Sequence, residues 1–172
     1  MKKSNGNNTL YYYFYTFKNI DVLVAERDNR VCFAHFQDSK DLGELSQQNT
    51  GSSIVCKRTP VLEQAHEYLF DNRSKAPRVM LEGSEFQQKV WQALMSIPFG
   101  STVSYTEVAA MINQPTAVRA VASAVAKNNV AYFIPCHRVV PASGGVGRYR
   151  WGQETKAMLL EREQALSELE SQ

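Results

Sequence analysis

The stretch Ser104–Asn129, SYTEVAAMINQPTAVRAVASAVAKNN, has the pattern of two short helices joined by a tight break. Ser104 and Glu107 have capping-box spacing, in which each side chain satisfies a backbone N–H at a helix start. Pro115 interrupts the first helix, because proline lacks the N–H that a helix interior needs. We expect the second helix to run from Pro115 to Asn128, a residue type that tolerates the left-handed conformation ending many helices. Together the two segments predict a helix-turn-helix.

Small side chains dominate the second helix, where Arg119 is the one long side chain near the start. The small residues there include Ala117, Ala120, Ala122 and Ser123. They could allow close packing inside a core, or they could let a slim helix enter a narrow groove of DNA. A helix that reads sequence in the major groove would carry several Arg, Asn or Gln side chains. If this helix binds DNA, we therefore expect backbone and shape contacts without sequence preference.

The first half of the chain has the sequence pattern of several β-strands and one helix. Residues 1 to about 9 resemble a polar tail, and the DLGELSQQNTGSS segment, residues 41–53, is a loop by composition. A helix is expected after the cap-like Thr59. Three segments rich in aromatic or β-branched residues predict an antiparallel meander, at residues 10–17, 20–27 and 31–36.

The sequence therefore predicts an α+β protein of two domains. Residues 1–81 form an N-terminal supporting domain, and residues 82–172 form a largely helical domain. The second domain opens with a helix whose capping box is Ser84 and Gln87. The segment from Gly83 to Gly152 contains six basic residues and only two acidic ones. That excess suits contact with phosphates, although a solvated surface is the more common explanation of such a charge distribution.

The bulk composition excludes several protein classes. With 172 residues, 44% hydrophobic and 21% charged, the chain has the composition of a globular protein. No apolar run approaches the ~20 residues of a membrane-spanning helix, and the polar start is unlike a signal peptide. We therefore expect a cytoplasmic protein that does not enter a membrane. Three widely spaced cysteines, with no CxxC pair, predict free thiols and no metal site.

The segment FIPCHRVVP, Phe133–Pro141, places a thiol beside a base. Pro135 should end a strand VAYFI and hold Cys136 in a rigid turn. Neighbours in a strand point to opposite faces, so His137 can assist Cys136 only across a turn or through a water molecule. An imidazole can take the thiol proton if a third group orients the ring. Glu163, one helical turn beyond an apolar pair, is the acid expected to face inward.

The motif IPCHRVV, with VSYTEVAAMINQPTAVRAVASAVAKN before it and GGVGRYRWG after it, resembles a known family. It is similar to the O6-alkylguanine-DNA alkyltransferases, also called methylated-DNA–protein-cysteine methyltransferases, and most of all to the bacterial Ada and Ogt types. The likeness runs from about Ser84 to Glu163, and residues 10–80 fit loosely. It implies a ribonuclease H-like small sheet with helices, followed by a winged-helix-like domain. Ada's zinc-binding and regulatory portion has no counterpart here, so we expect repair without that regulation.

The resemblance also implies a function, namely DNA repair by direct reversal. After nucleotide flipping, the alkyl group on O6 of guanine, mainly methyl, would pass irreversibly and once per molecule to Cys136. Whether O4 of thymine is also a substrate stays open. The expected partner is double-stranded DNA containing alkylated bases, bound by a monomer without sequence preference. No cofactor is expected.

The family's functional residues carry over at matching positions. Cys136 would accept the alkyl group, His137 would act as base through water, and Glu163 would orient His137. Tyr105 would donate a proton to the leaving guanine and lie against the backbone phosphate. Arg119 would fill the gap left by the flipped nucleotide, while the small residues of its helix, Ala117, Ala120, Ala122 and Ser123, would face the groove.

The remaining implied residues shape the pocket for the base. Asn128 would brace the turn near Cys136, and Val139, Tyr149 and Arg150 would line the pocket. Trp151 stands where the family often has glycine, so we expect it to narrow the pocket and favour methyl over benzyl groups.

Two other function classes are compatible with parts of the sequence. A DNA-binding module with an inert cysteine would bind any duplex without preference for alkylated guanine. A cysteine hydrolase would turn over repeatedly and would need an oxyanion hole, for which only the backbone near SGGVG is available.

Overall fold

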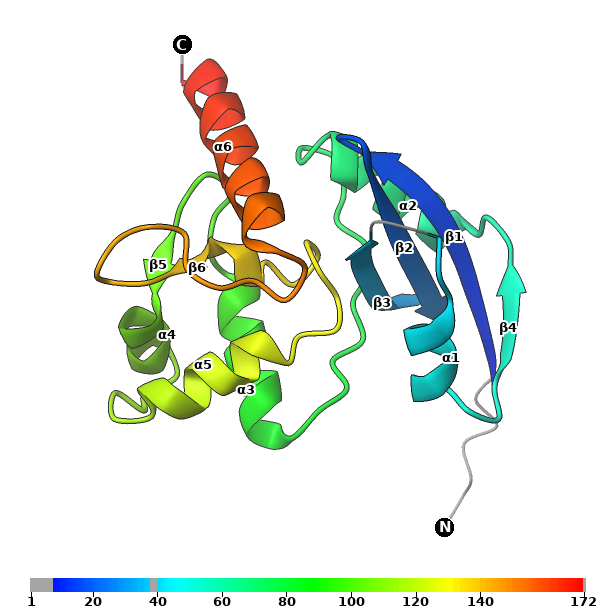
Figure 1. Cartoon of the computed structure of the whole chain (residues 1–172), viewed down its shortest axis with the longest axis horizontal. Helices are drawn as coiled ribbons and strands as arrows, with labels where there is room; N and C mark the ends of the chain where they lie inside the picture. The colour runs from blue at the N-terminus through cyan, green and yellow to red at the C-terminus, as the bar shows by residue number, and fades with distance from the viewer. Residues whose placement is uncertain (1–7, 38–39, 172) are drawn as a thin grey trace. The chain divides into compact units, whose positions relative to one another are not determined.

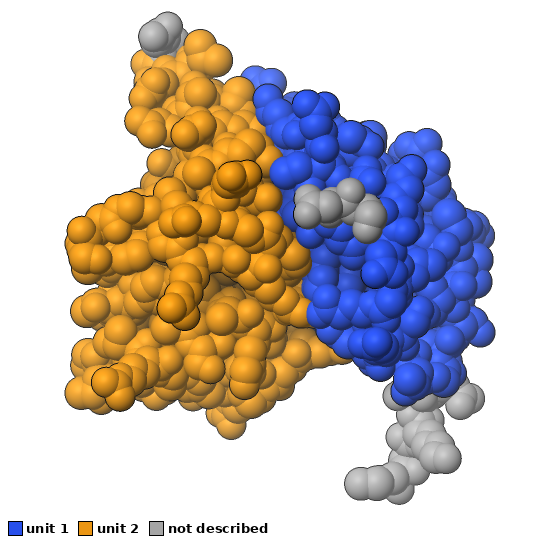
Figure 2. Space-filling view, in the orientation of Figure 1, with its two compact units in different colours: residues 1–80 blue, residues 81–172 orange. Residues whose placement is uncertain are grey.

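A computed structural model describes residues 8–37 and 40–171 of the chain, which divides into two compact units (Figures 1 and 2). Unit 1 is residues 1–80 and unit 2 is residues 81–172, so the division lies one residue before the expected boundary. Helices and strands occur in both units, which confirms the α+β class. Most of the predicted polar tail lies outside the described residues, and the first strand already begins at Thr9.

Unit 1 is built on a four-stranded sheet in the order β3-β2-β1-β4. The predicted antiparallel meander is confirmed, and a fourth strand pairs in parallel with β1. The two hairpin turns, Lys18-Asn19 and Asp28-Asn29, have positive φ at both residues, as a two-residue turn between twisted strands requires. The strands are β1 (Thr9–Phe17), β2 (Ile20–Arg27), β3 (Arg30–Gln37) and β4 (Ser53–Cys56).

Two helices complete unit 1, and one of them corrects the sequence prediction. The predicted helix is α2 (Pro60–Phe70), where the Thr59 side chain accepts from the backbone N–H of Leu62. The predicted loop at 41–53 instead contains α1 (Gly43–Gln48) and the first residue of β4. Leu45 explains the difference, because this leucine is fully buried in the core beside the sheet. Loop-like composition is overridden by tertiary packing of a single apolar side chain.

Unit 2 is mainly helical and holds a short parallel strand pair at its centre. Figure 1 shows α6 on one side of that pair and the other helices on the opposite side. Val103 of the first strand pairs with Val139 of the second, which brings the start of α4 toward the turn that carries Cys136. The elements are α3 (Glu85–Met95), β5 (Val103–Ser104), α4 (Tyr105–Met111), α5 (Val118–Ala126), the 3₁₀ turn η1 (Cys136–Arg138), β6 (Val139–Val140) and α6 (Gln153–Glu170).

The helix pair α4 and α5 follows the predicted pattern with three corrections. Helix α5 begins at Val118 rather than at Pro115, because Pro115 lies in the turn between the helices. Asn113, with φ 59°, takes the left-handed conformation expected of Asn128. At the start of α4, one of the two hydrogen bonds of the expected capping box is found: the Ser104 side chain accepts from the backbone N–H of Glu107.

The segment VAYFI, residues 130–134, is a chain of turns rather than the predicted strand. Tyr132 has φ 72°, a conformation that no strand residue adopts, and the N–H of Ile134 donates to the carbonyl of Val130 at 3.0 Å. The β-branched and aromatic residues of this segment favour a strand, but here all five residues are buried in a compact loop. None of the helices formed by the described residues combines the length and apolarity that crossing a membrane requires.

We predict that Ser84→Ala lowers the free energy of unfolding of unit 2 by about 1 kcal/mol, the usual value of an N-cap. The Ser84 side chain accepts from the N–H of Gln87 at 3.1 Å, and the Gln87 side chain accepts from the N–H of Ser84 at 3.0 Å. Urea unfolding followed by tryptophan fluorescence reports on this unit, which contains both tryptophans. Ser143→Ala, on an exposed loop, is the control and should leave stability unchanged. Equal stability of the two variants would contradict the prediction.

Candidate active site

A cavity of about 480 Å³ lies in unit 2 between the start of α4, helix α5, the turn η1 and the loop before α6. It brings together five of the predicted site residues, Tyr105, Ala122, Cys136, Tyr149 and Arg150. Its full lining is Tyr105, Ala122, Val125, Ala126, Cys136, Arg148, Tyr149 and Arg150. Aliphatic and aromatic groups with a few polar atoms are typical of a pocket for a flat organic molecule.

Cys136 sits at the start of η1, on the rigid turn that the sequence predicted. The N–H of Cys136 donates to the carbonyl of Ile134 at 2.8 Å, and the N–H of Arg138 donates to the carbonyl of Pro135 at 3.0 Å. The thiol is almost fully buried, at 4% exposure. Burial raises the pKa of the Cys136 thiol, an effect opposed by the Asn128 amide and by the positive charge of Lys156. Cys136 is therefore a thiol that needs a base before it can attack.

The Asn128 side chain holds the loop that leads to Cys136. Its amide nitrogen donates to the carbonyl of Ile134 at 2.9 Å and to the Cys136 sulfur at 3.2 Å, and the carbonyl of Val130 lies at 3.3 Å. Its amide oxygen accepts from the N–H of Val130 at 2.9 Å. One buried side chain thus ties both ends of the loop to the sulfur.

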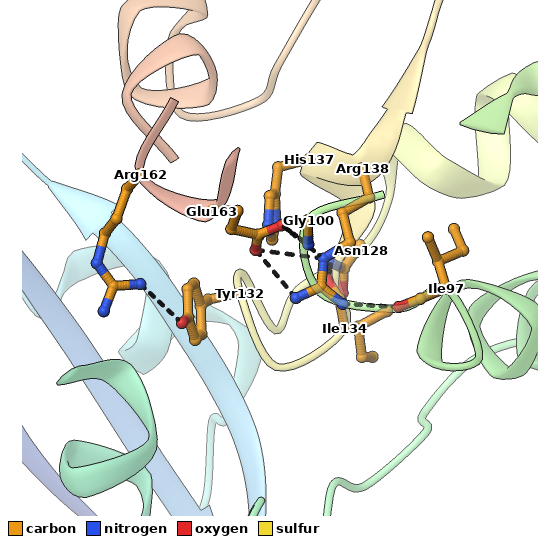
Figure 3. A network of polar contacts seen from close by, with 9 residues as sticks. All are labelled: Ile97, Gly100, Asn128, Tyr132, Ile134, His137, Arg138, Arg162 and Glu163. Carbon is orange, nitrogen blue, oxygen red and sulfur yellow. Dashed lines mark hydrogen bonds and ion pairs between the residues drawn. The ribbon is translucent and has the colours of Figure 1, made fainter. Parts of the chain in front are cut away.

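The His137 side chain points toward Glu163 of α6, which faces inward as predicted (Figure 3). The imidazole Nε2 lies 2.7 Å from a carboxylate oxygen of Glu163, and both side chains are at most 1% exposed. Hydrogen bonds from His137 and Arg138 overcome the cost of burial and lower the pKa of Glu163 to about 2. The carboxylate is therefore an acceptor, so Nε2 carries the hydrogen and Nδ1 is the basic nitrogen.

The basic nitrogen of His137 is available for a proton. Burial lowers the pKa of His137, so the ring is neutral at neutral pH. Nδ1 is buried and makes no hydrogen bond within the described part of the chain. A neutral imidazole with a fixed tautomer, on the residue next to Cys136 in the chain, is suited to general-base activation through a bridging water molecule.

Two cationic residues of the site were not singled out by sequence reasoning. Arg138 donates from Nε and Nη2 to the Glu163 carboxylate at 2.9 Å, and from Nη1 to the carbonyl of Ile97 at 2.8 Å. Lys156 donates to the carbonyl of Val139 at 2.7 Å. A signal for Lys156 existed, because it precedes Glu163 by seven residues and so shares one face of α6.

Two predicted pocket residues do not line the cavity. Val139 is fully buried, and its carbonyl is occupied by Lys156. Trp151 instead lies behind the lining, with its ring 5.2 Å from that of Tyr149 in a T-shaped contact. The Arg150 guanidinium lies 5.5 Å over the Trp151 ring and also donates to the carbonyl of Asn128 at 2.9 Å. Trp151 therefore supports two lining residues from the side.

The two tyrosines of the cavity stay protonated. Burial raises the pKa of Tyr105, and it raises the pKa of Tyr149 well above its ordinary value. The Tyr149 hydroxyl is buried without a hydrogen-bond partner among the described residues. Tyr105, as the first residue of α4, presents its hydroxyl at the same cavity. Both groups are thus potential hydrogen-bond donors to a bound base.

Helix α5 has one buried face and one open face. Ala124 belongs to the core, where the Trp91 indole N–H donates to its carbonyl at 3.0 Å. The open face carries Arg119, Ala120 and Ser123, and Ala117 and Ala122 are half-buried beside it. The small residues of α5 therefore fit both roles considered from the sequence. On one face they allow close packing against the core, and on the other they leave a slim surface that could enter a groove of DNA.

The other two cysteines, Cys32 and Cys56, belong to unit 1. Cys32 is half-buried against the core of unit 1, and Cys56 is exposed on β4. Within residues 8–37 and 40–171, no cluster of three His, Cys, Asp or Glu side chains has the geometry to hold a metal ion.

We predict that the ionised Glu163 side chain stabilises the folded protein and that this stabilisation is lost in acid. Because its folded pKa is about 2 against an ordinary 4.5, the contribution is complete above about pH 4.5 and is lost as the pH falls toward 2. Glu163→Gln should therefore lose less stability than the wild type between pH 5 and pH 3 in urea unfolding. Glu161→Gln, at an exposed position on the same helix, should follow the wild type. A Glu163→Gln curve parallel to the wild type would refute the assignment.

Comparison with known proteins places the site in a family. The model of the family described as "6-O-methylguanine DNA methyltransferase, DNA binding domain" matches residues 85–165, which include the cavity, His137 and Glu163. The chain is 59% identical over 83 residues to the regulatory protein Ada of Salmonella typhimurium, covering 48% of this chain and 24% of that protein. The chain also spans only 42% of the Ada protein of Escherichia coli and about half of a yeast relative from Kluyveromyces lactis.

Other relatives match over nearly their whole length. The inducible methylated-DNA–protein-cysteine methyltransferase of Bacillus subtilis is 35% identical over 166 residues, with 92% of this chain and 93% of that protein covered. The crystal structure of Mycobacterium tuberculosis OGT in complex with DNA is similar at a TM-score of 0.76 and 29% identity, covering 90% and 93%. With a relative of this similarity over nearly its whole length, and with the His137 that follows Cys136 bound to a buried Glu163, the chain belongs to the family of methylated-DNA–protein-cysteine methyltransferases.

Proposed function

We propose that this chain repairs alkylated DNA by moving an alkyl group, mainly methyl, from O6 of guanine to Cys136. The observation that carries the proposal is a buried thiol at the floor of an apolar cavity, next to a neutral imidazole fixed by Glu163. The family supports it, since relatives named for this activity share both the matched region and the length of the chain.

The reaction begins with a proton transfer. The Cys136 proton passes through a water molecule to Nδ1 of His137, while Glu163 holds the opposite nitrogen and stabilises the imidazolium that forms. The thiolate then attacks the alkyl carbon in line with the bond to O6. A carbon–sulfur bond forms as the carbon–oxygen bond breaks, and its electron pair leaves with the guanine. The Tyr105 hydroxyl supplies a proton to that leaving base.

The product of this step is a thioether, and it is expected to be final. Neither a base nor a nucleophile in the cavity can displace a thiolate from an unactivated alkyl carbon. The protein would therefore act once and be consumed, which distinguishes it from a cysteine hydrolase. No cofactor enters the reaction, because the leaving group is already an activated purine.

Access to O6 requires the nucleotide to leave the duplex. We propose that the open face of α5 enters the minor groove and that Arg119 fills the space left by the flipped nucleotide. Unstacking costs a few kcal/mol, and an inserted side chain offsets part of that cost. Small residues such as Ala120 and Ser123 give close backbone contact without reading sequence. The partner is therefore double-stranded DNA carrying alkylated bases, and the similar Mycobacterium tuberculosis protein is described in complex with DNA.

The finer features of the architecture belong to the same proposal. Unit 1 would be a ribonuclease H-like supporting domain, and unit 2 a winged-helix-like domain for DNA binding and alkyl transfer. Within the pocket, Asn128 would brace the reactive loop while Tyr149 and Arg150 contact the base. Val139 would act indirectly, through its carbonyl bond to Lys156. We also propose that the protein works as a monomer in the cytoplasm, where free thiols persist.

Intact-protein mass spectrometry tests the function directly. After incubation with a duplex carrying one O6-methylguanine, we expect the addition of one methyl group, mapped to Cys136 and never exceeding one per molecule. Exposed Cys56 serves as an internal control for nonspecific alkylation and should stay unmodified. Cys136→Ala should leave both the lesion and the protein mass unchanged.

Each alternative function predicts a different result. Binding to the duplex with an unchanged lesion and mass would support a DNA-binding module with an inert cysteine. Loss of the lesion without a mass change would mean true turnover. Either result would overturn the proposal.

We further predict that Trp151 limits the size of the alkyl group. Its ring supports Tyr149 and Arg150 at the wall of the cavity, so Trp151→Gly should let both move outward. The variant should react with O6-benzylguanine at least about tenfold faster relative to O6-methylguanine than the wild type does, a change of about 1.4 kcal/mol in discrimination. Competition between the two substrates, read by mass spectrometry, measures this ratio. An unchanged ratio would remove Trp151 from the specificity determinants.

A further inference from the structure

Arg138 occupies a position that the proposed reaction does not yet explain. The Glu163 carboxylate is held between two side chains from η1, the His137 imidazole and the Arg138 guanidinium (Figure 3). It also accepts from the backbone N–H of Gly100 at 3.3 Å. Arg138 is 6% exposed, so this guanidinium is largely removed from solvent. A buried guanidinium is costly unless it balances a charge, and here that charge is Glu163.

The guanidinium changes what the carboxylate does to the imidazole. A buried carboxylate with histidine as its only partner would draw a proton onto the ring, because an imidazolium would compensate its charge. Arg138 already compensates that charge with two N–H groups, at 2.9 Å from Nε and 2.9 Å from Nη2. The carboxylate can then accept a hydrogen bond from Nε2 of a neutral ring.

We infer that Arg138 is a positioning residue that keeps His137 neutral and therefore able to take the Cys136 proton. This inference rests on the proposed function, in which His137 acts as the base. Glu163 alone would fix the ring orientation but would also favour the charged ring, which has no basic nitrogen left. Arg138 separates these two effects, since it retains the orientation and reduces the tendency of the ring to be protonated before it accepts the Cys136 proton.

The other groups around His137 fit this assignment. Lys156 on α6 adds a second positive charge that disfavours an imidazolium. The Tyr132 ring stacks on the imidazole at 5.8 Å and 8°, and its hydroxyl accepts from Arg162 of α6 at 3.3 Å. Cys136, the proton donor, precedes His137 on η1. Glu163 is therefore the acidic group at the ring, and Arg138 is its direct counter-charge.

The test is the pH profile of single-turnover transfer from an O6-methylguanine duplex, measured for the whole chain between pH 5 and pH 9. Arg138→Met removes the charge at similar length, and Arg138→Lys keeps a charge while losing the planar fork. We expect the acid limb of Arg138→Met to move up by about one pH unit, so that at the acid end of the range transfer falls up to about tenfold further below its own plateau than in the wild type. Arg138→Lys should keep the acid limb close to that of the wild type.

A purely structural role for Arg138 would give a different pattern. Arg138→Met would then lose the same factor at every pH, and its acid limb would coincide with the wild type, which would overturn the inference. Thermal melting of each variant at both ends of the pH range separates loss of folding from loss of the base. Lack of transfer by the wild type at any pH would refute the proposed function instead.

A second measurement does not depend on the variants folding. In the wild-type protein, ¹⁵N spectra of the His137 ring should show a neutral imidazole with the hydrogen on Nε2 at pH 6.5. An imidazolium at that pH would overturn the inference even if alkyl transfer is normal. The ring spectra of Cys136→Ala, which cannot react, provide the assignment control.

Discussion

The buried carboxylate of Glu163 is the interaction on which the rest of unit 2 depends. It joins α6 to η1 through His137 and Arg138, and it reaches the chain after α3 through the backbone N–H of Gly100. Three segments far apart in sequence therefore meet at two oxygen atoms. Because an unpaired buried charge is so unfavourable, all three segments must be in place together. The same group that organises the fold also fixes the tautomer of the base.

A second constraint acts on the other side of the cysteine. The Asn128 amide ties the loop of residues 130–134 to the sulfur, and the pairing of Val103 with Val139 brings Tyr105 to the same cavity. The site is thus built on buried backbone contacts and short turns, and the strained φ of Tyr132 is compensated by its packing and by Arg162. Rigid surroundings allow the thiol, the base and the cavity to keep fixed relative positions.

Much of this arrangement is predictable from the sequence, and the exceptions have physical reasons. The meander, the capped helices and the inward face of Glu163 follow from periodicity and caps, which are local signals. Helix α1 was not predicted, because its formation depends on the burial of one leucine, Leu45. The strand predicted for VAYFI was wrong, because burial in a compact loop outweighed the β propensity of these residues. Trp151 was predicted to narrow the pocket, but its contacts with Tyr149 and Arg150 and the pairing of Arg138 with Glu163 were not predicted, since ring packing and counter-charge are properties of tertiary neighbours. The roles of the site residues remain predictions until the measurements above are made.

The position of Glu163 in the chain has a consequence for how the protein is made. Cys136 leaves the ribosome before Glu163, by 27 residues, and η1 has no carboxylate partner until the first turns of α6 have formed and docked. During that interval His137 lacks its fixed tautomer and the thiol lacks its base. In the proposed mechanism, the thiol is therefore activated only once α6 has docked against η1.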